Sequence, residues 1–248
     1  MSVYQSLLNR LGSQKANYLV LIDPDRKNDG LLQDLVAEVN DSGADAILVG
    51  GSLIMDGAFE ERVKAIKSAS DVPVILFPGA SNQLSREADA ILFMSLLSGR
   101  NPQYLIGEQV QAAPVVKHMG LETIPTGYLL MAGGSPTSVE FMSNSQPLPM
   151  DKPDIVVAHA LAAQYLGMSV VYLEAGSGAQ RSVSDEVIQS VSRALDIPVI
   201  VGGGIRRPEE AADKVRAGAQ FIVTGTILEQ GENHGIMAAF AKAIHQGS

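Results

Sequence analysis

Short apolar runs rich in valine, isoleucine and leucine recur along the whole chain. Eight of them are present, at residues 18–22, 46–49, 72–77, 90–94, 122–130, 169–173, 197–201 and 221–223. Most run continuously instead of alternating with polar residues, which is typical of parallel strands that are covered on both faces. The pattern therefore predicts eight buried parallel β-strands.

Helix-like segments separate most of these runs. They lie at residues 31–42, 58–68, 102–118, 155–166, 185–195, 208–217 and 235–245. Eight strand–helix units in 248 residues predict a (β/α)₈ TIM barrel of the phosphate-binding type, with residues 1–248 as one domain. A doubly wound open sheet is the second choice.

Two connections depart from this rhythm. Between the third and fourth strands only ASNQLSREAD, residues 80–89, is available, whereas a parallel crossover usually needs a dozen or more residues. We therefore expect the third helix to be reduced or missing. The segment after the fifth strand, residues 131–153, is long, poorly periodic and rich in serine, proline and glycine, so we predict a loop over the barrel mouth.

Composition narrows the possible functions. The formal net charge is −9 without a lysine or arginine cluster, which argues against nucleic-acid binding. Cysteine is absent, which excludes disulfides and thiolate chemistry. No apolar stretch approaches the roughly 20 residues of a spanning helix, and residues 1–11 lack the pattern of a signal peptide. We expect a cytoplasmic protein.

The carboxyl ends of the predicted strands carry the candidate site, because active sites of such barrels lie there. Strands six, seven and eight end in glycine-rich loops. Gly202-Gly203-Gly204 and Gly225-Thr226 occupy the usual phosphate-binding position of this architecture, although glycines there also serve tight turns.

Acidic residues stand at two other strand ends. Asp23 is a candidate Mg²⁺ ligand, because this ion usually takes one or two carboxylates together with substrate phosphates. Asp25 fits a metal ligand and a helix cap equally, and Ser52 either adds a hydroxyl or caps a helix. Glu174 ends an interior strand, where a carboxylate requires a partner. His118, His159, His234 and His245 fall on predicted helices or their ends, and we interpret them as structural.

Six motifs together resemble one family. LIDPD, ILVGGS, NPQYLIGEQV, YLEAGSG, VGGGIR and TGT, in this order and spacing, are similar to the geranylgeranylglyceryl phosphate synthases. These are prenyltransferases on a phosphate-binding (β/α)₈ barrel, and their missing third helix agrees with the short connection above. The resemblance covers residues 18–229, almost the whole chain.

The resemblance implies a reaction and a set of site residues. The family joins sn-glycerol 1-phosphate to a polyprenyl diphosphate through an ether bond and releases diphosphate, with Mg²⁺ as cofactor. Asp23 and Ser52 fall at its metal positions. Its glycerol-phosphate positions correspond to Tyr172, Leu173, Glu174, Ala175, Gly176, Ser177, Gly178, Gly203, Gly204, Gly225 and Thr226. Some relatives carry a substrate-binding lysine where this chain has Leu21, so Arg26 or Lys27 is a candidate replacement.

The residues suggest individual roles in that reaction. We predict that Glu174 binds the attacking glycerol hydroxyl and takes its proton, with Tyr172 beside it. The alternative is that Glu174 only orients the hydroxyl. Tyr104 either limits the depth of the prenyl chain, by default geranylgeranyl, or is a plain core or interface tyrosine. The resemblance also implies a homo-oligomer, a dimer or a hexamer, and we expect at most peripheral membrane contact.

Two other functions share the glycine-rich loops. A sugar-phosphate isomerase or aldolase would need an acid/base pair, for which Asp23 and Glu174 are the candidates, or a lysine that no strand end supplies. A non-catalytic phosphate-sensing barrel is the third possibility, since the fold alone never determines the function.

Overall fold

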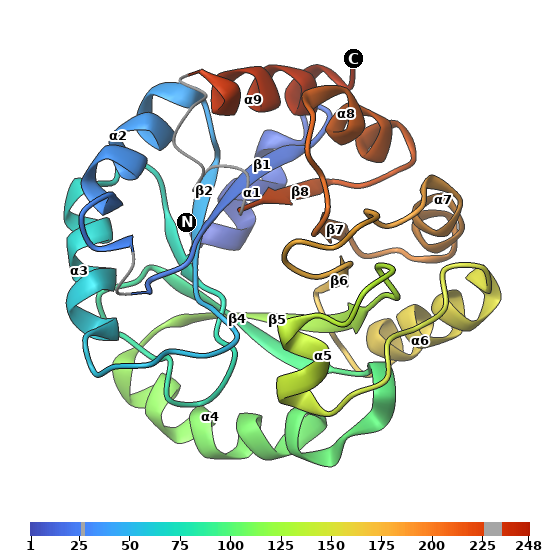
Figure 1. Cartoon of the computed structure of the whole chain (residues 1–248), viewed down its shortest axis with the longest axis horizontal. Helices are drawn as coiled ribbons and strands as arrows, with labels where there is room; N and C mark the ends of the chain where they lie inside the picture. Colours follow the sequence, from blue (N-terminus) through green and yellow to red (C-terminus); the bar gives the residue numbers. More distant parts are fainter. Residues whose placement is uncertain (26–27, 226–234) are drawn as a thin grey trace.

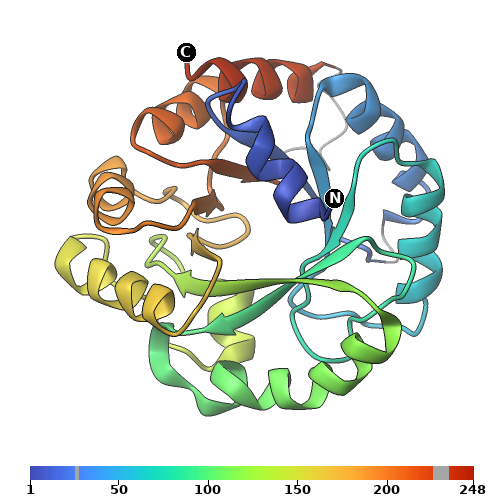
Figure 2. The same cartoon turned by 180° about the vertical axis from the view of Figure 1, so that it is seen from behind.

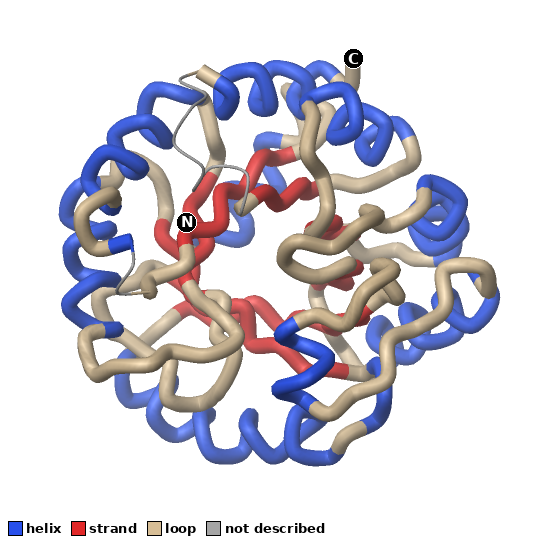
Figure 3. The backbone as a smooth tube through the Cα atoms, in the orientation of Figure 1, coloured by secondary structure: helices blue, strands red, loops and turns tan. Residues whose placement is uncertain are grey.

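A closed ring of eight parallel strands forms the centre of the computed structural model, which describes residues 1–25, 28–225 and 235–248 (Figures 1 and 3). Neighbours in the sequence pair in order, and β8 returns to pair with β1. This confirms the predicted barrel. The strands are β1 Asn17–Ile22, β2 Ala46–Val49, β3 Val74–Leu76, β4 Ala90–Leu96, β5 Glu122–Leu130, β6 Val170–Glu174, β7 Val199–Gly202 and β8 Phe221–Thr224.

Side chains alternate between two apolar layers along each strand. On β6, Tyr172 belongs to the inner cluster that fills the barrel, whereas Val171 and Leu173 belong to the outer cluster between sheet and helices. Both layers are buried, which explains why the strands read as continuous apolar runs. The same alternation aims Glu174 into the barrel, two residues after Tyr172.

Helices surround the sheet as the sequence predicted (Figure 3). They are α2 Leu32–Ser42, α3 Phe59–Ala69, α4 Glu108–Met119, α6 Pro153–Tyr165, α7 Asp185–Ala194, α8 Pro208–Arg216 and α9 Ile236–Gln246. A 3₁₀ turn, Ser98–Arg100, and a π-helical turn, Gln103–Gly107, precede α4. Residues 77–89, between β3 and β4, contain no helix, which confirms the expected gap.

Two helices were not predicted. α1, Val3–Arg10, lies across the amino-terminal end of the barrel (Figure 2) and begins at a Ser2 cap whose hydroxyl accepts a hydrogen bond from Gln5 N. α5, Ser138–Ser143, lies at the barrel mouth within the segment after β5 (Figure 1). Thr137 caps it by accepting from Glu140 N. The segment lies at the barrel mouth as predicted, but the prediction that it forms a loop was wrong over α5.

Asp45 ties both ends of the chain to the bottom of the barrel. Its buried carboxylate accepts hydrogen bonds from Arg10 of α1 at 2.9 Å, from the Tyr18 amide at 2.8 Å and from Gln14 at 3.1 Å, and it pairs with His245 of α9 at 2.8 Å. Burial alone raises the pKa of Asp45, but these hydrogen bonds outweigh it and bring the pKa below its ordinary value. The carboxylate thus stays charged and fixes both terminal helices.

Candidate active site

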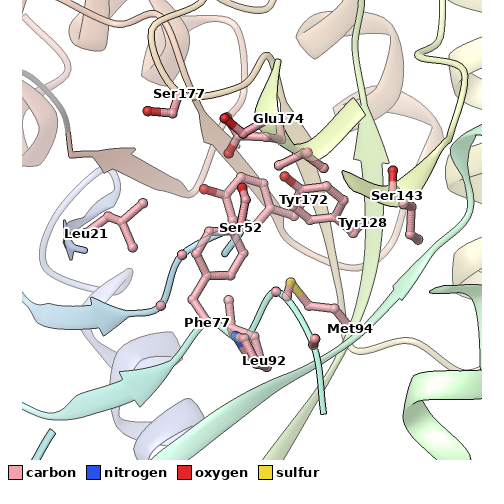
Figure 4. A pocket seen from close by; sticks show the side chains of 18 of the residues that line it. Leu21, Ser52, Phe77, Leu92, Met94, Tyr128, Ser143, Tyr172, Glu174 and Ser177 are labelled. Atoms are coloured by element: carbon pink, nitrogen blue, oxygen red, sulfur yellow. The ribbon is translucent and has the colours of Figure 1, made fainter. Parts of the chain in front are cut away.

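A cavity of about 760 Å³ lies at the carboxyl ends of the strands (Figure 4). One wall carries Glu174, Ser177 and the glycines after β6, β7 and β8. Asp23 and Ser52 line a second wall, after β1 and β2. An apolar arm is lined by Leu84, Phe93 and Ala112, from the helix-free connection, β4 and α4. The cavity therefore joins a polar cup to an apolar arm.

Glu174 is the buried carboxylate of the polar cup. It is only 6% exposed, and its Oε1 accepts a hydrogen bond of 2.6 Å from Gly176 N. Burial raises the pKa of Glu174 to about 6, although the Gly176 amide and the nearby Tyr172 hydroxyl each favour the charged form. The Tyr172 hydroxyl is buried without a well-formed hydrogen bond in the described chain. The polar cup thus contains a buried carboxylate and, beside it, a buried hydroxyl that lacks a well-formed hydrogen bond.

The loops after β6 and β7 close around this carboxylate. Gly203 has a φ of 80°, and a Cβ placed there would lie 2.3 Å from Glu174 Oε1, so only glycine fits. Arg206 joins the two loops, because its Nη2 donates to Ala179 O at 2.7 Å and its Nη1 donates to Gln180 O at 3.2 Å. Arg206 also lines the cavity. Sequence reasoning passed over this arginine, although it follows directly on the VGGGI motif.

The loops after β1 and β2 meet at Gly51. A Cβ on this residue would lie 2.8 Å from Asp23 Oδ1, so the absence of a side chain leaves room beside the carboxylate. Gln83, from the helix-free connection, holds Gly51 in place: its Nε2 donates to Gly51 O at 2.7 Å, and its Oε1 accepts from Gly51 N at 3.2 Å. The same Oε1 accepts from Gly79 N at 3.1 Å.

Arg62 of α3 supports these loops from below. Its Nη1 donates to Pro24 O at 3.1 Å and to Asp56 Oδ1 at 2.7 Å, and its Nη2 donates to Asp29 Oδ2 at 3.0 Å. A buried guanidinium bonded to both loops restricts their movement relative to each other. Neither Gln83 nor Arg62 stood out in the sequence.

Asp23 and Ser52 both line the cavity, and a carboxylate and a hydroxyl are oxygen ligands of the kind that Mg²⁺ takes. Among the described residues, no group of three or more acidic or histidine side chains converges into a metal cluster. A Mg²⁺ site need not contain such a cluster, because this ion usually takes one or two carboxylates and completes its shell with substrate phosphates and water. Asp25 does not line the cavity within the described chain, whereas Leu21 does.

Tyr104 closes part of the apolar arm. It lies in the π-helical turn and lines the cavity, and its hydroxyl donates to Met142 O of α5 at 3.1 Å. Met142 and Val139 of α5 line the cavity as well. The segment after β5 therefore covers the arm and is held by Tyr104.

The remaining candidate residues differ in their position relative to the cavity. Leu173 and Ala175 are fully buried in the outer apolar layer, because they alternate with Tyr172 and Glu174 along the strand. Ser177, Gly178, Gly204 and Gly225 line the cavity. His118 and His159 lie on α4 and α6, outside the cavity lining, and His245 pairs with Asp45. Thr226, Arg26, Lys27 and His234 lie outside the described residues.

The fold and the cavity together define a TIM barrel whose site is polar at one end and apolar at the other. The chain belongs to the PcrB family, whose model matches residues 11–244. It is 43% identical to a geranylgeranylglyceryl phosphate synthase of Chitinophaga pinensis over 98% of this chain and 96% of the relative. Identity to the Thermococcus kodakarensis enzyme of the same name is 48%, over 86% of this chain and 84% of the relative.

A solved structure supports the same relationship. The crystal structure of (S)-3-O-geranylgeranylglyceryl phosphate synthase from Thermoplasma acidophilum, in complex with its substrate sn-glycerol-1-phosphate, superposes with a TM-score of 0.93. The two chains are 40% identical, and the match covers 99% of each. No helix among the described residues has the length and apolar character needed to cross a membrane.

Proposed function

We propose that this protein is a prenyltransferase that joins sn-glycerol 1-phosphate to a polyprenyl diphosphate through an ether bond. The observation that carries the proposal is that a polar cup and an apolar arm meet in one cavity. A polar phosphate ester and a long hydrocarbon need such different walls within reach of each other. Similarity to a relative solved with sn-glycerol-1-phosphate supports the assignment of the cup.

Glycerol phosphate binds in the cup between the loops after β6, β7 and β8. Gly178, Gly203, Gly204 and Gly225 let the backbone approach the phosphate, and Arg206 adds a positive charge at this edge. Glu174 accepts a hydrogen bond from the attacking glycerol hydroxyl. In this arrangement the buried carboxylate and the substrate hydroxyl are hydrogen-bond partners.

The reaction exchanges one carbon–oxygen bond for another. The bond between the allylic carbon and the diphosphate oxygen breaks, and its electron pair leaves with the diphosphate. The glycerol oxygen then forms the ether bond to that carbon and loses its proton to Glu174. A pKa near 6 leaves most of this carboxylate charged at neutral pH and hence able to accept the proton.

Asp23 and Ser52 would hold Mg²⁺ at the diphosphate end of the cavity. The ion supplies electrophilic stabilisation of the negative charge that develops on the leaving diphosphate. Gln83 and Arg62 hold the loops that present these two oxygen ligands. We place the reaction in the cytoplasm, which suits a chain without cysteine.

Incubation with sn-glycerol 1-phosphate, labelled geranylgeranyl diphosphate and Mg²⁺ tests the proposal. We expect an ether-linked lipid phosphate in the organic extract and free diphosphate in the aqueous phase, and no product after metal chelation. Turnover of sugar phosphates without prenyl transfer would favour the isomerase or aldolase. Phosphate binding without turnover of either substrate pair would favour the sensor.

A further inference from the structure

The turn that carries Tyr104 departs from α-helical geometry. It is π-helical over Gln103–Gly107, and Glu108 N donates to Gln103 O, five residues back instead of four. The extra residue changes the direction of side chains in the turn relative to those of α4 by roughly 100°, the rotation per residue of an α-helix. Tyr104, which lines the cavity, would therefore point in another direction if this turn were α-helical.

Two side chains outside the turn hold its carbonyl groups. Ser95 of β4 donates through its Oγ to Leu105 O at 2.5 Å. Gln109 of α4 donates through its Nε2 to Tyr104 O at 3.0 Å and to Met94 O of β4 at 2.5 Å. These three hydrogen bonds tie the π-helical turn to β4.

Gln109 makes its two bonds at the expense of its own acceptor. Its amide nitrogen serves two backbone carbonyls, whereas its Oε1 is buried with no hydrogen-bond partner in the described chain. A buried acceptor without a partner destabilises a fold, and such a group in a native structure calls for a reason. An apolar side chain would fill this place without that penalty. The position of the turn supplies a reason for the amide.

We propose that Gln109 and Ser95 are positioning residues for prenyl chain length, because they hold the π-helical turn that aims the Tyr104 ring at the apolar arm. The inference rests on the proposed prenyl transfer and deepens it by naming the residues that fix the depth of the arm. Neither residue acts on the reacting atoms. Loss of either side chain releases a carbonyl of the turn, which shifts the Tyr104 ring and lengthens the arm.

Inert farnesyl, geranylgeranyl and geranylfarnesyl thiodiphosphates test this role by calorimetry with Mg²⁺ and without glycerol phosphate. For Gln109→Leu we expect the affinity for the geranylfarnesyl probe, relative to that for the farnesyl probe, to rise about threefold to tenfold. Ser95→Ala removes the bond to Leu105 and should raise the same ratio about twofold to fivefold. Ser95→Ala also tests the inference if Gln109→Leu does not fold.

A double variant shows whether Gln109 acts through Tyr104. Tyr104→Ala removes the ring and should raise the ratio by itself. Adding Gln109→Leu to Tyr104→Ala should then change the ratio less than about twofold, because no ring remains to be positioned. An unchanged ratio in Tyr104→Ala, or additive shifts in the double variant, would overturn the inference.

Val116→Ala is the control for a general loss of stability. Val116 is buried on α4, as a neighbour of Gln109 in the same helix, but does not line the cavity within the described chain. This variant should lower the Tm and leave the ratio within about twofold of the wild type.

Equal weakening of all three probes by Gln109→Leu, or an unchanged ratio in both single variants, would overturn the inference while leaving the proposed function intact. Failure of the wild-type protein to form any prenyl ether would contradict the proposed function instead.

Discussion

Glu174 shows how a single residue combines a structural cost with a chemical use. Its carboxylate is buried at the end of β6, and burial raises its pKa from 4.5 to about 6. A base with a pKa near the working pH is largely unprotonated and still has a high affinity for the proton. The amide of Gly176 and the space left by Gly203 keep the carboxylate in place without neutralising it.

Glu174→Gln should lower kcat by about 100-fold or more, because it removes the base but keeps a hydrogen-bond acceptor. In the wild type, kcat/KM should fall below pH 6 as the carboxylate takes up a proton, and this decline should vanish in the variant. Steady-state kinetics between pH 5 and 8 measure both effects. An unchanged rate at pH 7.5 would reduce Glu174 to an orienting residue.

Glu174→Gln should lower activity but raise the stability of the folded protein. Because the pKa of Glu174 is higher in the folded state, its stabilising contribution is fully present below about pH 4.5 and is lost as the pH rises through about 6. Above that pH, Glu174→Gln should raise the free energy of unfolding by up to about 2 kcal/mol. Urea unfolding at pH 5 and pH 8 checks this, and equal stabilities at pH 8 would contradict it.

Tyr104 offers a prediction about substrate length. Its ring lines the apolar arm and its hydroxyl holds Met142 of α5, so Tyr104→Ala should open the arm and weaken its cover. We expect the preference, measured as kcat/KM for prenyl diphosphates of increasing length, to move to longer chains. Tyr104→Phe removes the hydrogen bond alone. An unchanged preference in both variants would leave Tyr104 a packing residue.

The helix-free connection is the element that distinguishes this barrel. Without a helix between β3 and β4, the segment 77–89 brings Gln83 to the Gly51 backbone and Leu84 to the apolar arm. One irregular element thus supplies both a support for the loop that carries Ser52 and a wall for the hydrocarbon. A helix at this place would cover the strands and take up that space.

Gln83→Leu should weaken binding at the diphosphate end, because the amide that pairs with Gly51 is lost in a buried place. We expect about tenfold weaker binding of an inert prenyl thiodiphosphate by calorimetry, and glycerol-phosphate affinity within about twofold of wild type. Ser85→Ala, a buried change in the same segment, is the control. Equal loss at both ends would mean that Gln83 serves general stability.

The elements differ in how well the sequence predicts them. Strands such as β2 and β6 could be predicted from the sequence, because burial on both faces produces uninterrupted apolar runs. Helix α5 could not be predicted, because its six residues lie between proline- and glycine-rich stretches and depend on the Thr137 cap. The alternation along β6 would have placed Leu173 and Ala175 outside the barrel, but motif matching treated residues 172–178 as one continuous site.

The site residues that sequence reasoning missed act through distant partners. Gln83 and Gly51 are 32 positions apart, and Phe77 meets Tyr172 only when the ring of strands closes. Neither contact leaves a local pattern, because glutamine and phenylalanine are ordinary residues of loops and cores. Arg206 had a local signal in the glycine motif beside it.

At the scale of the whole molecule, the cavity and the contacts that hold the two terminal helices lie at opposite ends of the barrel. The cavity lies at the carboxyl ends of the strands, while Asp45 joins α1 and α9 at the amino-terminal end. Changes in the loops around the site therefore need not disturb the contacts that hold the two terminal helices. The sides of the barrel remain available for contacts between copies of the chain.

One side carries apolar residues that a monomer would leave in water. Val110 of α4 is 64% exposed and Phe141 of α5 is 83% exposed. Ile106 of the π-helical turn before α4 and Met142 of α5 are exposed as well, and the Tyr104–Met142 hydrogen bond joins that turn to α5. Exposed apolar residues gathered in this way mark association surfaces. We therefore propose that copies of the chain associate through this side, as a dimer or a hexamer.

Val110→Glu should dissociate that assembly, because a charge would be buried without a partner in the interface. Sedimentation equilibrium should give a multiple of 26.2 kDa for the wild type and 26.2 kDa for the variant at the same concentration. Ala239→Glu adds the same charge to an exposed position on α9 and should leave the assembly intact. A wild-type mass of one chain would contradict the proposed assembly. Dissociation by Ala239→Glu but not by Val110→Glu would place the contact elsewhere on the barrel.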